Sequence, residues 1–147
     1  MSNLSYLTFD VDSTDPDCPL TFQVTVNDQP QGIATVVTKS LSFNIELNDN
    51  ALSEIYHIKL TMSGKLSKHT ELDSQGNFVK DPRLLLSNFA LSQIPCDFAV
   101  FKTAIYQHDC NGSAPLSDNQ FSGVMGCNGT VTFSVSTPFL LWLLENT

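Results

Sequence analysis

Four closely spaced aspartates, Asp10, Asp12, Asp15 and Asp17, form the most suggestive chemical group near the N-terminus. Ca²⁺ prefers oxygen ligands and takes about six to eight of them, so carboxylates on a loop that leaves a strand can supply several. The run lacks the glycine and the closing glutamate of an EF-hand loop. We therefore treat the four aspartates as a candidate calcium site. The alternative is a solvated loop with an Asx-turn ahead of Pro16.

A second chemically capable group begins at Tyr106, where the chain reads YQHDCNG. A tyrosine ring can stack on the face of a sugar, and His108, Asp109 and Asn111 can bond its hydroxyls, so we predict these four as ligand-binding residues. His108 and Cys110 could also act as the base and the nucleophile of a catalytic pair. Neighbours in sequence rarely present that geometry, and no catalytic signature surrounds them, so an ordinary polar loop is the alternative.

Other constellations argue against enzymatic chemistry and against zinc. The sequence has no G-x-S-x-G elbow, and its few glutamates stand in no recognisable motif. No two cysteines have C-x-x-C spacing, so we expect no zinc site. We expect free thiols, some of them buried, at Cys18, Cys96, Cys110 and Cys127.

Charge and hydropathy limit the partners and the location of the chain. The 147 residues carry a formal net charge of −8, and the seven Lys and Arg do not cluster. A face for nucleic acid or for an anionic membrane needs clustered cations, so neither partner is expected. The N-terminus has no basic and apolar stretch typical of a signal peptide, and the apolar run 139–144 is too short to span a bilayer. We expect a protein made in the cytoplasm.

Alternation of apolar and polar residues with a period of two dominates the sequence and predicts strands that are buried on one face. The clearest strands are expected at 20–26, 41–47, 56–62 and 131–135. Less regular candidates lie at 6–11, 33–37, 84–91, 98–106 and 121–125. The alternation places eight residues in the core: Phe22, Val24, Phe43, Ile45, Ile58, Leu60, Val131 and Phe133.

Turn residues separate these strands, and Asn128-Gly129 is typical of a type I′ hairpin turn. The apolar tail 137–146 fits either a short buried helix or a central strand. About eight to ten short antiparallel strands predict an all-β, single-domain β-sandwich of jelly-roll type over residues 1–147.

Two stretches resemble known protein classes. The stretch HIKLTMSGK from His57 to Lys65, followed after a polar loop by DPRLLLSNFAL from Asp81 to Leu91, resembles the late strands of jelly-roll carbohydrate-binding modules. That resemblance implies a sandwich fold and a glycan ligand. The C-terminal stretch 126–146 is similar to small uncharacterised proteins of marine tailed phages, which implies a virion component.

Three functions follow from these observations. The first is a non-catalytic binding or assembly module of the carbohydrate-binding kind, with a glycan as its partner and Ca²⁺ as its cofactor. The second is a virion structural protein, a capsid decoration or tail accessory of a tailed phage. It would be a homo-oligomer on the virion surface and contact other virion subunits through its apolar tail. A small hydrolase is the third and ranks last, because no catalytic constellation supports it.

Overall fold

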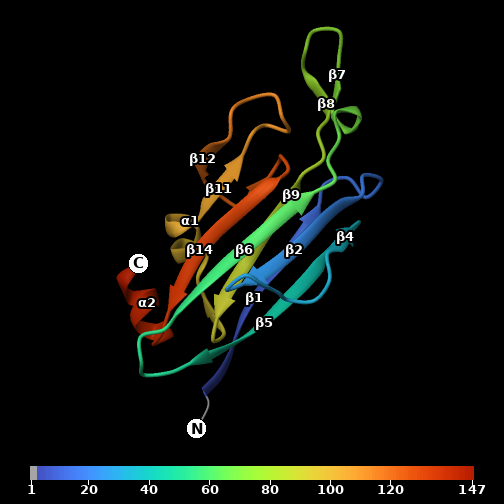
Figure 1. Cartoon of the computed structure of the whole chain (residues 1–147). Coiled ribbons are helices and arrows are strands. Elements are labelled where there is room, and N and C mark those ends of the chain that lie inside the picture. The colour runs from blue at the N-terminus through green and yellow to red at the C-terminus, as the bar shows by residue number, and fades with distance from the viewer. Residues whose placement is uncertain (1–2) are drawn as a thin grey trace.

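The computed structural model describes residues 3–147 and shows two antiparallel sheets that pack face to face (Figure 1). The first sheet has the strand order β10-β9-β1-β5, and β13 also pairs with β9. Its strands are β1 (Asn3–Ser13), β5 (Leu41–Asp49), β9 (Leu84–Leu91), β10 (Ile94–Pro95) and β13 (Val124–Met125).

The second sheet has the order β12-β11-β14-β6-β2-β3, and β4 also pairs with β2. Its strands are β2 (Leu20–Val26), β3 (Gln29–Pro30), β4 (Thr35–Val37), β6 (Ile55–Ser63), β11 (Ile105–His108), β12 (Ser117–Gln120) and β14 (Gly129–Ser136). A separate hairpin of β7 (Glu71–Leu72) and β8 (Phe78–Lys80) projects beyond one end of the sandwich (Figure 1). The helices are α1 (Asp97–Thr103), α2 (Phe139–Glu145) and the 3₁₀ turn η1 (Ser67–His69).

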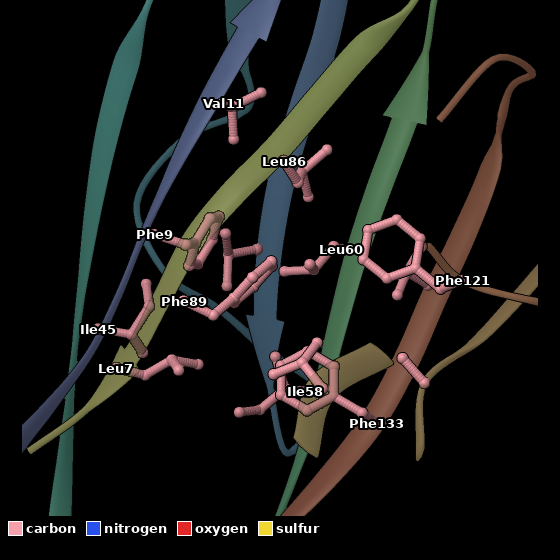
Figure 2. Packing of buried hydrophobic residues seen from close by; sticks show 14 of the residues in the cluster. Leu7, Phe9, Val11, Ile45, Ile58, Leu60, Leu86, Phe89, Phe121 and Phe133 are labelled. Carbon is pink, nitrogen blue, oxygen red and sulfur yellow. The ribbon is translucent and has the colours of Figure 1, made fainter. Parts of the chain in front are cut away.

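The predicted all-β sandwich is confirmed, and its alternating strands are the reason that it forms. In β2 the apolar residues are buried and the residues between them are half-buried, so one face of the strand lies on the core. The inner faces of both sheets contribute to one cluster of apolar side chains (Figure 2). Of the fourteen strands within residues 3–147, four (β3, β7, β10 and β13) are only two residues long.

Seven of the eight predicted core residues are buried, and Phe43 is the exception. Its side chain is half-buried at the rim of the cluster. The Phe43 ring stacks on Phe9 with centroids 5.3 Å apart and lies 5.1 Å from the Phe22 ring. Phe43 lies on β5, the strand at the end of the sheet path, so a strand neighbour shields it on one side only.

Three local predictions are wrong. The range predicted as a strand at 98–106 begins as helix α1, and only its last residues belong to β11. A short apolar run does not distinguish a strand from a helix, and here Ala99 and Val100 are buried together, as on a helix face. The range 33–37 holds a strand only from Thr35, and the range 121–125 holds one only at Val124–Met125.

The tail and the turns complete the comparison with the sequence. The apolar tail forms the helix α2, which was one of its two predicted forms. Neither Asn128 nor Gly129 has a positive φ, so the type I′ turn predicted there is absent. Asn27 and Asp28, with φ of 49° and 65°, have the backbone signs of such a turn, between β2 and β3. Among residues 3–147, neither helix has the length and hydropathy that crossing a bilayer requires.

Candidate functional site

A surface hollow of about 480 Å³ lies on the outer face of the first sheet, and we call it the sheet hollow. In β1, Tyr6 and Thr8 alternate with the buried Leu7 and Phe9, so they face away from the core. The Tyr6 side chain is 41% exposed. The sheet hollow is lined by Leu4, Ser5, Tyr6, Thr8, Asn44, Asp49, Ser92 and Gln93.

One wall of the sheet hollow is held in place by a turn. Ser92 and Gln93 connect β9 to β10 with φ of 52° and 67°, and the Ser92 amide donates to the Tyr6 carbonyl at 3.1 Å. The Ser92 hydroxyl also hydrogen-bonds the hydroxyl of Ser5. The hollow therefore presents an aromatic ring, amides and hydroxyls on a fixed backbone. Sequence reasoning missed Tyr6, although its phase opposite to Leu7 was the signal that could have found it.

Asp10 and Asp12 of the candidate calcium site lie on this same outer sheet face, within β1 and not on a loop. Asp10 accepts a hydrogen bond at each carboxylate oxygen, from the Ser42 hydroxyl at 2.8 Å and from the Asn88 amide at 2.9 Å. The Asn88 and Ser42 hydrogen bonds lower the pKa of Asp10. Asp12 accepts a hydrogen bond from the Ser40 hydroxyl.

Asp15 and Asp17 lie on the loop after β1, apart from the sheet face. The Asp15 carboxylate pairs with the Lys80 ammonium at 3.0 Å, and this contact lowers the pKa of Asp15. Its other oxygen accepts from the Asp17 amide at 3.0 Å, which is the Asx-turn that the alternative interpretation predicted. The four aspartates are thus divided between two settings, and three of them already have protein partners.

A second hollow, of about 520 Å³, contains three of the four predicted ligand-binding residues, and we call it the loop hollow. It is formed by the loop after β11 and the start of β14. Its lining residues are Gln107, His108, Asp109, Asn111, Gly112, Leu116, Asn128, Gly129 and Thr130.

Tyr106, the fourth predicted residue, is buried and only 6% exposed. Its ring packs against Phe121 and against the imidazole of His108, with the latter centroids 4.6 Å apart. Its hydroxyl donates to the Cys127 carbonyl and accepts from the Cys127 amide at 2.9 Å. Burial raises the pKa of the Tyr106 phenol. Tyr106 therefore positions its neighbours and offers no ring face on which a sugar could stack.

Hydrogen bonds between distant segments shape the loop hollow. The Asn111 side-chain oxygen accepts a hydrogen bond from the backbone amide of Asn128 at 2.8 Å. The side-chain amide of Asn128 donates one to the Lys65 carbonyl at 2.8 Å. The buried Lys65 ammonium donates to Asp81 at 2.6 Å and to the Gly126 carbonyl at 2.7 Å. The segment 126–128 is therefore held from several sides.

Beside the loop hollow, His108 meets two cysteines that are distant from each other in sequence. One potential ligand atom from each of His108, Cys110 and Cys127 lies within 4.8 Å of the other two. The His108 Nδ1 accepts from the Cys110 amide at 3.0 Å. Burial raises the pKa of the Cys127 thiol, and the charge of Cys110 acts in the same direction. The Cys127 thiol is therefore not activated as a nucleophile.

Comparison with known proteins identifies the fold. The sequence matches no protein-family model and no curated protein. A solved structure of vCBM60, its selenomethionine form, comes from work on a circular permutation that links two families of calcium-dependent carbohydrate-binding modules. It superposes with a TM-score of 0.51 at 11% identity, over 88% of this chain and 89% of that one.

A second structure, vCBM60 in complex with galactobiose, has a TM-score of 0.45 at 10% identity, over 87% of this chain and 96% of that one. The first likeness shows that this chain shares a β-sandwich fold with a carbohydrate-binding module. Sandwich folds carry many functions, so the site must be argued from its own residues.

Proposed function

We propose that this chain is a non-catalytic carbohydrate-binding module that holds a glycan in the sheet hollow. The observation that carries the proposal is the exposed Tyr6 ring in a hollow lined by amide and hydroxyl side chains on a rigid strand face. The fold shared with vCBM60 supports it, because that protein is a carbohydrate-binding module.

The chemistry of the sheet hollow suits a sugar. A pyranose ring presents an apolar face of C–H groups, which can pack on the Tyr6 ring, and an edge of hydroxyls. The side chains of Asn44 and Gln93 are exposed and carry both donors and acceptors. Each can therefore hydrogen-bond a sugar hydroxyl that donates or one that accepts. None of these three contacts depends on charge, in agreement with the low charged content of 15%.

Calcium is part of the proposal at Asp10 and Asp12, on the same face of β1 as Tyr6. The calcium-dependent families described with vCBM60 support it. A Ca²⁺ ion at Asp10 would take the place of the Asn88 and Ser42 donors that now occupy its oxygens.

The test is a glycan array probed with the purified chain, once with Ca²⁺ and once with EDTA. We expect binding that Tyr6→Ala weakens about tenfold, the loss of roughly 1.4 kcal/mol that an aromatic contact supplies. Tyr6→Phe keeps the ring and should bind like the parent chain. EDTA should weaken binding if Ca²⁺ bridges Asp10 to the glycan.

Matched variants separate the two hollows. Asp109→Ala changes the loop hollow only, and it should leave glycan binding unchanged. If Asp109→Ala abolishes binding while Tyr6→Ala does not, the glycan occupies the loop hollow and the assignment to Tyr6 is wrong. If no glycan binds in either buffer, the carbohydrate-binding function itself is wrong.

A structural subunit of a virion stays the second candidate. The observation that favours it is the outer side of α2, where Leu140, Leu141 and Leu144 are exposed. Exposed leucines on one helix suit contact with another subunit, as the homo-oligomer prediction requires.

A further inference from the structure

The side-chain cluster of His108, Cys110 and Cys127 combines three groups that bind the same class of metal ion. Two thiols and an imidazole nitrogen lie within 4.8 Å of one another, and both thiols are free. Ligand atoms around a tetrahedral zinc ion are roughly 3.5–4 Å apart, given Zn–S and Zn–N distances of about 2.3 and 2.0 Å. Adjustments of less than about 1 Å would therefore bring the three atoms onto one ion.

One nitrogen of the His108 imidazole belongs to the cluster. The His108 Nδ1 accepts a hydrogen bond from the Cys110 amide, so the neutral ring carries its proton on Nε2. Nδ1 is thus free of a proton, and a cation could take its lone pair in place of the Cys110 backbone amide. The Tyr106 ring lies against the imidazole and limits its rotation.

The two cysteines are held by different parts of the chain. The backbone of Cys127 is fixed, because the Tyr106 hydroxyl forms hydrogen bonds with both the amide and the carbonyl of Cys127. Cys110 has a φ of 53° and Asn111 a φ of 57°, which are uncommon for residues other than glycine. Such strained residues persist only where the surroundings hold them, and here the bond from Asn128 to Asn111 ties the two segments together.

We infer that His108, Cys110 and Cys127 form a binding site for a thiophilic divalent cation, with Zn²⁺ as the preferred ion. Two thiolates and an imidazole are a ligand set that selects zinc over the oxygen-preferring Ca²⁺ or Mg²⁺. Three protein ligands leave the fourth position of a tetrahedral ion open, and Cys110 is exposed, so solvent reaches the site. On binding, each thiol releases its proton to solvent and the cation takes the Nδ1 lone pair in place of the Cys110 amide.

This site differs from the expectation drawn from sequence spacing. Absence of a C-x-x-C pair argued against zinc, but spacing along the chain does not detect ligands that meet across the β11–β14 pairing. The inference does not depend on glycan binding, because the cluster is separate from the sheet hollow.

The experiment uses the full chain, reduced with a phosphine and freed of metal, and then mixed with Zn²⁺. We expect one zinc ion to remain with each chain after gel filtration, measured by elemental mass spectrometry. Cobalt substitution should add a thiolate-to-metal charge-transfer band and the visible bands of a tetrahedral ion. Both signals should be lost in Cys110→Ser, whose exposed side chain is outside the core.

Further variants distinguish ligands from bystanders. His57→Gln removes an exposed histidine elsewhere and should keep the zinc, whereas His108→Gln should lose most of it. Tyr106→Phe keeps all three ligands but removes the hydroxyl that fixes Cys127, and it should weaken zinc binding about 10- to 100-fold. Tyr6→Ala should bind zinc as the parent chain does. A failure of the glycan proposal would therefore leave the zinc result unaffected.

Two results would overturn the inference. One is a parent chain, shown by circular dichroism to be folded, that retains no more zinc than Cys110→Ser. The other is a Cys110–Cys127 disulfide that forms in air, once the phosphine is removed, even with stoichiometric zinc present. It is detected as a mass lower by two hydrogens.

Discussion

Asp10 has a hydrogen-bond donor at each carboxylate oxygen, and one of these donors, Asn88, is 78 positions away in the sequence. Because these donors favour the ionised form, the pKa of Asp10 lies below its ordinary value of 3.8. A lowered pKa in the folded state stabilises the protein at pH values above about 3.8. That contribution is lost as the pH falls through the lower folded pKa.

Asp10→Asn should therefore lower the free energy of unfolding at neutral pH, by roughly 0.5–1.5 kcal/mol, the net worth of one hydrogen bond. The difference from the parent chain should shrink as the pH falls below 3.8 and through the lowered pKa of Asp10. Urea unfolding at several pH values measures it. Asp17→Asn removes an exposed carboxylate on the loop after β1 and serves as the control. If the loss of unfolding free energy in Asp10→Asn stays constant as the pH becomes acidic, the charge of the Asp10 carboxylate plays no part in stability.

At the scale of elements, Gly129 at the start of β14 has no room for a side chain, because the neighbouring β11 lies too close. A Cβ atom at Gly129 would lie 2.4 Å from the Gln107 carbonyl oxygen and 2.8 Å from the His108 Cβ. Gly129 is opposite His108 in the register of the two strands. This glycine serves close strand packing and not the turn predicted from the Asn-Gly pair.

Gly129→Ala should destabilise the protein by about 1–3 kcal/mol, because the added methyl group must push two strands apart. Gly126→Ala is the matched control. Its Cβ would meet only the Arg83 side chain, at 3.6 Å, and the change should stay within about 0.5 kcal/mol. Thermal unfolding of both variants measures the difference. Equal melting temperatures for the two variants would contradict the packing argument.

At the scale of the whole molecule, Phe89 connects the two sheets through the centre of the core (Figure 2). Its ring stacks on Phe9 of its own sheet at 5.0 Å and meets Phe133 of the other sheet edge to face at 6.3 Å. It also contacts Phe101 of α1 at 6.1 Å. One side chain thus contributes to three packed layers.

Phe89→Ala should cost about 3–5 kcal/mol of unfolding free energy, since Phe89 is 1% exposed and the sheets cannot close over the cavity. Phe78→Ala, on the exposed β7–β8 hairpin, should cost less than about 0.5 kcal/mol. Chemical denaturation with a fluorescence readout from Trp142 compares them. A loss below about 1 kcal/mol for Phe89→Ala would mean that the core repacks around the gap.

The sequence by itself determined the all-β class, most of the long strands and most of the core. These features follow from alternation with a period of two, which is local and can be read along a short stretch of chain. The 98–106 range was misread because a short apolar run fits a helix as well as a strand, and only packing against β9 decides between them.

Only the tertiary structure decided which polar residues meet. Strand pairing brings Cys127 to His108 and Cys110, buries Tyr106 and places donors on Asp10 from β5 and β9. It also separates Asp10 from Asp15, although the two are close in sequence. The register between distant strands depends on the packing of the whole core, so no local pattern in the sequence contains these contacts.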